Sequence, residues 1–208
     1  MKYSNNQLKL ANTAIAKGMA FALGTWFIPI PVIGSAACNK AETIMLKGIL
    51  DALNENSSNE KIDKIFWFFR KKYFLMNLVT FVPHAGATVQ LIDVYAMGQF
   101  ALALCEDSVN LANELAMEKT WEVIEPKIWD ADQIIVFYES SSGTIFPTNI
   151  KTAFVATVDK LGTLAQGINR VPGLAQGQEV AAEVLREGVH AAEEGISWLL
   201  KKTSKWIG

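Results

Sequence analysis

GMAFALGTWFIPIPVIGSAAC, residues 18–38, carries no charged side chain and is interrupted by Pro29 and Pro31. About twenty apolar residues are enough for a helix to span a membrane. A spanning helix must satisfy all of its backbone hydrogen bonds internally, whereas proline removes a donor and excludes the residue before it from the α region. The stretch therefore predicts two helices that meet at a bend near Pro31, rather than one straight span.

A second uncharged stretch, YFLMNLVTFVPHAGATVQLI at residues 73–92, has the same character and is broken at Pro83. In both stretches a glycine, Gly34 or Gly86, follows the proline by three residues, and the second corner lies 52 residues after the first. Proline and glycine are common at bends between helices, and a fixed spacing is also typical of an internal repeat. We predict two hydrophobic helical hairpins and leave open whether one is a duplicate of the other.

Helical periodicity dominates the remainder of the chain, and no segment shows the sustained alternation of a strand. Polar turn residues separate helical segments at residues 54–60 and 140–148, and Pro126 interrupts another. The sequence therefore predicts an all-α helical bundle of about six to seven helices. We expect these helices at residues 5–26, 35–53, 61–82, 85–117, 121–138 (interrupted at Pro126), 149–168 and 174–205.

The clearest loop in the chain, SSSGTIFPT at residues 140–148, separates two regions of different composition. We predict a hydrophobic helical-hairpin region at residues 1–139 and a C-terminal amphipathic helical region at residues 140–208. The two regions could also form a single domain, because 208 residues are compatible with either arrangement.

Composition and motifs exclude several functional classes. Charged residues make up 19% of the chain and the net charge is −2. The chain therefore lacks the excess of basic residues that is typical of a nucleic-acid-binding protein. The chain contains no phosphate-binding glycine loop and no nucleophile elbow, and its two cysteines and two histidines do not form a metal-binding pattern. We therefore expect no enzymatic activity, no cofactor, no metal and no nucleic-acid partner.

Basic and aromatic side chains flank the uncharged stretches, as is typical of segments that meet lipid headgroups. Arg70, Lys71 and Lys72 precede the second stretch. Each tryptophan taken alone is more often a core residue, and the combination is what favours a membrane. The candidate membrane and hinge residues are Trp26, Phe27, Pro29, Pro31, Gly34, Trp67, Arg70, Lys71, Lys72, Phe81, Pro83, His84 and Gly86.

The first corner, Pro29–Gly34, leads into a helix of small residues that ends near Gly48. It resembles the hydrophobic helical domain that accompanies Era-like GTPases and occurs in YcjF-type inner-membrane proteins. The second corner, Phe81–Gly86 leading into Asp93, is similar to the helical EcsC family. The resemblance covers about residues 14–105. It implies membrane association without catalysis, with a GTPase as one candidate partner.

Three functions remain consistent with these patterns. The first is a non-enzymatic membrane-associated helical protein, an anchor, membrane shaper or adaptor that is cytoplasmic and lies against or inside the inner face of a membrane. The second is a soluble all-helical interaction or effector protein. The third is a pore-forming protein with a concealed hydrophobic hairpin. The partner would be a bilayer surface or a protein, including a second copy of the chain. The deciding question is whether the apolar hairpins face lipid or a protein core.

Overall fold

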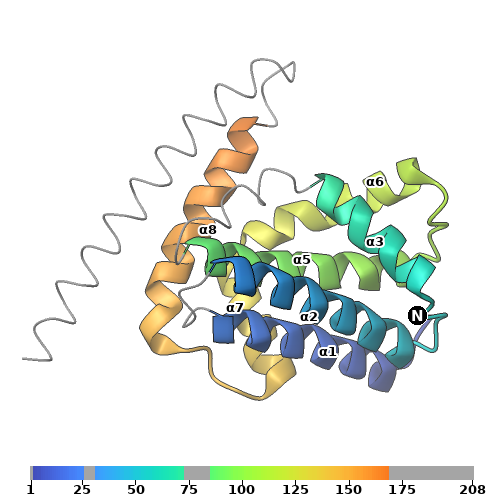
Figure 1. The fold of residues 1–208 in the computed structure, drawn as a ribbon, viewed down its shortest axis with the longest axis horizontal. Coiled ribbons are helices and arrows are strands. Elements are labelled where there is room, and N and C mark those ends of the chain that lie inside the picture. The colour runs from blue at the N-terminus through green and yellow to red at the C-terminus, as the bar shows by residue number, and fades with distance from the viewer. Residues whose placement is uncertain (1, 26–30, 73–84, 169–208) are drawn as a thin grey trace, which may run out of the picture.

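The computed structural model describes residues 2–25, 31–72 and 85–168, and the side chains at residues 25, 31–38, 71–72, 85–87 and 164–168 are not described. Every regular element in these ranges is helical, which confirms the predicted all-α bundle. The α-helices are α1 (Asn5–Thr25), α2 (Pro31–Ala52), α3 (Asn59–Lys72), α5 (Ala85–Glu106), α6 (Glu114–Ile124), α7 (Ala131–Ser142) and α8 (Thr148–Ile168), with a short 3-10 helix η1 (Glu125–Trp129) after α6 (Figure 1).

The predicted start of the second helix was four residues late. The sequence predicted a helix from residue 35, but α2 already begins at Pro31. Proline is well suited to the first position of a helix, because its fixed φ is helical and its missing N–H would have no intrahelical partner there. The third helix begins at Asn59, and the part of its predicted range beyond Lys72 lies outside the described residues.

The prediction of one continuous helix over residues 85–117 was wrong. The chain leaves the helix after Glu106, and Ser108 adopts a left-handed φ of 52°. Asparagine side chains then take over backbone donors, since Asn110 accepts from Ala112 N–H and Asn113 caps α6 by accepting from Ala116 N–H. Such side chains offer the backbone an alternative to helical hydrogen bonds, which explains the break.

The interruption predicted at Pro126 is confirmed. α6 ends at Ile124, and Pro126 lies inside η1. The carboxylate of Asp130 then caps α7 by accepting a hydrogen bond from Gln133 N–H at 3.0 Å. Gly143, with a φ of 69°, ends α7 in the left-handed conformation that glycine favours.

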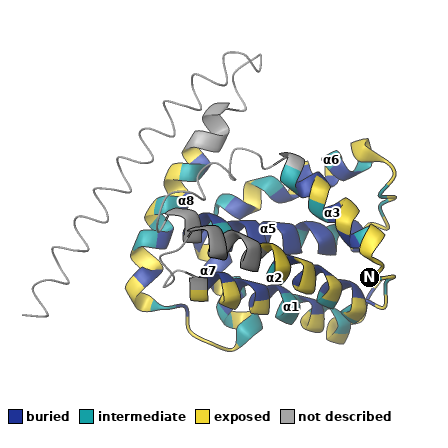
Figure 2. Ribbon diagram, viewed as in Figure 1, coloured by how far each residue is buried: buried dark blue, intermediate teal, exposed yellow. Residues whose placement is uncertain are grey.

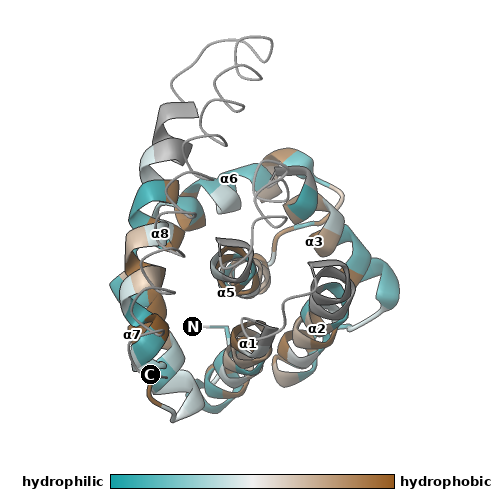
Figure 3. Cartoon of the chain, turned by 60° about the vertical axis from the view of Figure 1, so that its left-hand side comes forward, coloured by the Kyte–Doolittle hydropathy of each residue, from teal (hydrophilic) through white to brown (hydrophobic). Residues whose placement is uncertain are grey.

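Helix α5 lies at the centre of the bundle, and the other helices surround it (Figure 3). From Thr88 to Cys105 every residue is buried except Gln90, Gln99 and Ala103, which are half-buried (Figure 2). Thr88–Glu106 is the one stretch among the described residues that is long and apolar enough to cross a membrane, yet 83% of that window is buried inside the protein. The core helix of a soluble protein has the same properties.

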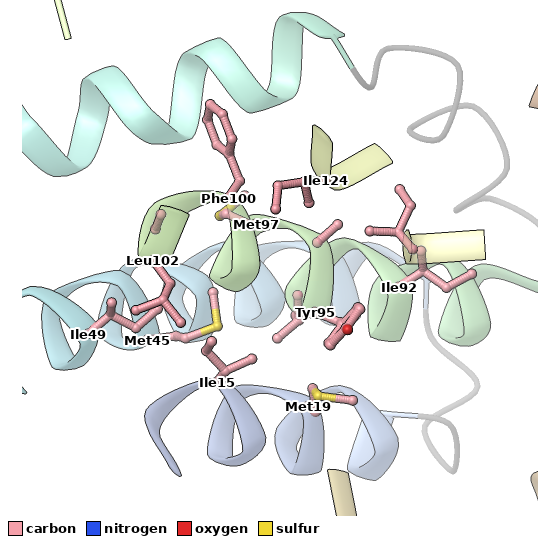
Figure 4. Close-up of a cluster of buried hydrophobic side chains, with 14 of the residues drawn as sticks. Ile15, Met19, Met45, Ile49, Ile92, Tyr95, Met97, Phe100, Leu102 and Ile124 are labelled. Carbon is pink, nitrogen blue, oxygen red and sulfur yellow. The ribbon is translucent and has the colours of Figure 1, made fainter. Parts of the chain in front are cut away.

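Two glycines allow α1 and α5 to approach each other closely. A Cβ atom on Gly98 of α5 would lie 2.7 Å from Ile15 Cγ1 of α1, and a Cβ atom on Gly18 of α1 would lie 2.9 Å from Val94 Cγ1 of α5. Side chains of α1 and α2, including Ile15, Met19 and Met45, pack against α5 (Figure 4). The small residues therefore permit close contact between helices inside the protein.

A single hydrophobic cluster runs through the described bundle from Tyr3 to Val158. It includes Phe146, Ile150 and Phe154, which lie beyond the predicted boundary at residue 140. The described part of the C-terminal region therefore packs on the same core as the N-terminal helices. The predicted last helix, residues 174–205, lies outside the described residues.

We predict that Gly98→Ala destabilises the bundle by about 1–3 kcal/mol, because the added methyl group overpacks the contact with Ile15. Urea unfolding followed by circular dichroism measures the free energy of unfolding. Gly24→Ala on α1 is the matched control, since a Cβ atom added there would meet nothing within 4 Å, and we expect it to be neutral or stabilising by up to about 1 kcal/mol. Equal effects of the two substitutions would contradict the close contact.

Candidate functional site

The buried carboxylates of the described residues are Glu42 on α2 and Asp93 on α5, each 1% exposed. Both bind the guanidinium of Arg70 on α3. Nη2 of Arg70 donates to Glu42 Oε2 at 2.5 Å and to Asn39 Oδ1 at 3.1 Å, and Nη1 donates to Asp93 Oδ2 at 3.3 Å. We call these four residues the Arg70 cluster. It joins three helices through one side chain.

Aromatic packing on α3 holds Arg70 in place. Its guanidinium carbon lies 5.2 Å from the ring centroid of Phe66, one helical turn earlier. The neighbouring Phe69 makes an edge contact with Trp121 of α6 at 5.7 Å, and Phe68 stacks on Phe100 of α5 at 5.4 Å. Because these rings fix α3 across α5 and α6, they also fix the direction in which Arg70 points.

The charges of the cluster do not balance when every group is ionised, because two carboxylates share one guanidinium. The second oxygen of Asp93, Oδ1, is buried and has no hydrogen-bond partner. Burial raises the pKa of Asp93 to about 8, helped by the charge of Glu42 and opposed by Arg70. Burial also raises the pKa of Glu42, against the opposing effect of Arg70. Among the described side chains, the site is therefore short of one positive charge.

A second polar cluster lies where the N-terminal residues meet the C-terminal end of α5. Glu55 accepts hydrogen bonds from Tyr3, Lys2 and Lys61, and these bonds, that from Tyr3 first, lower the pKa of Glu55 to about 2. Tyr3 and Lys2 also donate to the carbonyl of Cys105. Lys2, Glu55, Lys61 and Cys105 border a cavity of about 180 Å³. The cluster ties the N-terminus to the last turn of α5, where cations suit the exposed carbonyls.

The structure places Arg70 differently from its predicted role. It was chosen as part of a basic flank facing headgroups, but its guanidinium is bonded to two buried carboxylates and its side chain is only 15% exposed. Trp67 is 67% exposed and makes an edge contact with the ring of Phe66.

The other candidate residues are described only by backbone or not at all. Pro31 and Gly34 lie in the first turn of α2, Gly86 lies in the first turn of α5, and Lys71 and Lys72 end α3. Trp26, Phe27, Pro29, Phe81, Pro83 and His84 lie outside the described residues. Because part of the second corner is among them, the internal repeat stays a prediction.

The fold brings the described parts of the two uncharged stretches together. α1 ends with Thr25 at the same end of the bundle at which α2 begins with Pro31 and α5 begins with Ala85 (Figure 1). Positions far apart in the sequence thus share one end of the molecule. We call this the corner end of the bundle.

Sequence reasoning missed Asn39, Glu42 and Asp93 as members of a site, although one signal was available. Asp93 is the only charged residue between residues 85 and 105. A lone charge in an apolar helix needs a partner when it is buried, so Asp93 could have been singled out. Its partners could not have been identified, because Arg70 and Glu42 lie on two other helices.

Within the described residues no group of three or more histidine, cysteine, aspartate or glutamate side chains could hold a metal ion. The Arg70 cluster offers carboxylates, a guanidinium and an amide. These groups can bind a proton or orient one another. The cluster contains no serine, threonine, cysteine or lysine side chain.

Comparison of the chain with protein-family models, with curated proteins and with solved structures found no match in any of the three. The resemblance to the YcjF-type and EcsC-like helical families therefore stays a prediction.

We predict that Arg70→Met destabilises the protein by about 3–5 kcal/mol, because it leaves the buried carboxyl groups of Glu42 and Asp93 without their cationic partner. Chemical unfolding at pH 7 measures the loss. Lys64→Met is the control on the same helix, since Lys64 forms an exposed pair with Glu60 and its removal should change stability little. An Arg70→Met variant as stable as the Lys64→Met variant would show that the cluster contributes nothing to folding.

Proposed function

We propose that this chain is a non-enzymatic membrane-associated helical protein that acts as an anchor, membrane shaper or adaptor on the cytoplasmic side of a membrane. The observation that carries the proposal is the corner end of the bundle. The described ends of α1, α2 and α5 that border both uncharged stretches lie together there (Figure 1). The described parts of the two uncharged stretches thus share one end of the molecule.

The described residues at the corner end support contact with an apolar phase. The last eight residues of α1, Gly18–Thr25, carry no charge, and Phe21 among them is 46% exposed. Placing one large apolar side chain in an apolar environment gains about 1.5–3 kcal/mol. The uncharged residues of both corners would add to that gain. The bundle need not open for such docking, because α5 remains packed against protein.

A second candidate, a pore-forming protein with a concealed apolar helix, is favoured by α5 itself. This helix is long and apolar enough to span a membrane and is almost wholly covered by its neighbours. Apolar helices held inside a bundle lose little when they exchange protein contacts for lipid contacts. The two candidates differ in whether α5 stays inside the bundle when the protein meets a membrane.

The first candidate predicts that the purified protein floats with liposomes and that Phe21→Glu weakens this binding. Loss of about 1.5–3 kcal/mol of apolar contact corresponds to a drop in partitioning of about tenfold to a hundredfold. The measurement is flotation with phosphatidylcholine vesicles and with vesicles that also contain an anionic lipid.

Leu115→Glu is the matched control for this experiment. Leu115 is 61% exposed, and it lies in the first turn of α6, after the C-terminal end of α5 and away from the corner end. We expect it to float like the wild type. Failure to float with any lipid composition would leave the soluble interaction protein as the better description.

The second candidate predicts that membranes expose Cys105, a buried residue in the last turn of α5. In a Cys38→Ser background, labelling of Cys105 by a maleimide should accelerate at least about tenfold when vesicles are added, because opening becomes the favoured state. Leakage of a dye trapped in the vesicles should follow the same time course. Slow labelling together with efficient flotation would reject the pore and favour the anchor.

A further inference from the structure

We propose that the Arg70 cluster is a proton-binding site, in which Asp93 carries a proton while the bundle is closed and its ionisation loosens the grip of α2 and α3 on the central helix α5. The inference rests on the charges of the core and does not depend on membrane association. It goes beyond the proposed function, because it describes how the fold holds α5 in solution.

Glu42 and Asp93 together carry more negative charge than Arg70 can neutralise. Glu42 and Asp93 are each 1% exposed, so water cannot compensate an excess negative charge in this part of the core. One guanidinium neutralises one carboxylate, and burying the second as an unpaired anion is strongly unfavourable. A bound proton removes the excess charge without any further group.

The contacts of the two carboxylates decide which of them takes the proton. Glu42 forms the shorter contact with Arg70, 2.5 Å against 3.3 Å for Asp93. Asp93 also has an oxygen without a hydrogen-bond partner. A neutral carboxyl group tolerates a missing partner far better than a carboxylate does. Glu42 and Arg70 therefore form the ion pair, and Asp93 is the neutral member.

The described side chains around α5 provide no other cation that could neutralise the second carboxylate. Arg70 from α3 and Glu42 from α2 are the charged groups that face Asp93. Every other charged side chain described on the surrounding helices is exposed or half-buried, and the half-buried cation among them, Lys61, pairs with Glu55. Burial, with a smaller contribution from the charge of Asp130, raises the pKa of Tyr95 on α5.

The sign of the pH dependence follows from the folded state. Burial raises the pKa of Asp93 from an ordinary value of 3.8 to about 8. The folded protein therefore binds a proton at pH values where the unfolded chain has released it. The stabilisation that this proton provides is complete below about pH 4 and is lost as the pH rises through about 8.

The cluster also explains why this proton would matter for the fold. Its members come from α2, α3 and α5, so a change at Asp93 acts on all three helices at once. When Asp93 ionises, Glu42 and Asp93 compete for the same guanidinium and repel each other. The contact of α2 and α3 with α5 is therefore weakened at the Arg70 cluster.

The test is thermal unfolding of the full chain between pH 5 and pH 9, compared with Asp93→Asn. Asparagine imitates the neutral carboxyl group and cannot ionise. We expect the wild-type Tm to fall as the pH rises, whereas the Tm of Asp93→Asn stays level and exceeds that of the wild type by about 4 °C or more at pH 9. If Asp93→Asn is less stable at every pH and keeps the wild-type slope, Asp93 is an ionised partner of Arg70 and the proposal is wrong.

Two further variants separate the charge effect from packing. Glu42→Gln removes the competing carboxylate, so Asp93 can pair with Arg70 and the pH slope should also disappear. Asp63→Asn, at an exposed position on α3, should leave the slope unchanged. Infrared spectroscopy at pH 6 should show the band of a protonated carboxyl group in the wild type and not in Asp93→Asn. A band that persists unchanged in Asp93→Asn would overturn the assignment.

Discussion

The burial of α5 on almost every side is the constraint on which the other helices depend. A helix without a polar face cannot lie on the surface of a bundle, so six further helices and η1 are arranged around it in the described structure. Close approach of α1 requires Gly18 and Gly98 at the contact. The one charge inside the helix, Asp93, requires Arg70 from α3. Small residues and a buried cation are thus two consequences of the same central helix.

This constraint bears directly on the choice between protein and lipid. The uncharged stretches were predicted to form hairpins that face either lipid or a protein core, and the described side chains of the second, Thr88–Ile92, face protein in this fold. The corner end is a different part of the molecule, where the end of α1 lies beside the starts of α2 and α5. An apolar core helix inside the protein is therefore compatible with the proposed contact between the corner end and a membrane.

The helical class, the loops at residues 53–58 and 143–147 and the break at Pro126 could be predicted because they depend on local sequence, namely periodicity, turn residues and proline. The break after Glu106 was missed because apolar residues continue beyond it, and only the side chains of Asn110 and Asn113 reveal it. The Arg70 cluster could not be predicted, because its partners lie 23 and 28 residues away in the chain. The direction of Arg70 depends on the aromatic contacts of α3 with α5 and α6, and a run of three basic residues contains no information about those contacts.

Under the proposed membrane association, a neutral Asp93 would affect the exchange of α5 between protein and lipid. An ionised aspartate in the middle of α5 would oppose transfer of the helix into lipid, as it opposes burial in the bundle. A protonated one is tolerated in both environments, so the proton does not by itself favour lipid over protein. The discrimination comes from Arg70 and Glu42, which form an ion pair that has no counterpart in lipid and would have to separate from α5 or stay behind with α2 and α3. Opening of the bundle would also require loss of the aromatic contacts of α3, so the same contacts that position Arg70 would help to keep the apolar helix inside the protein.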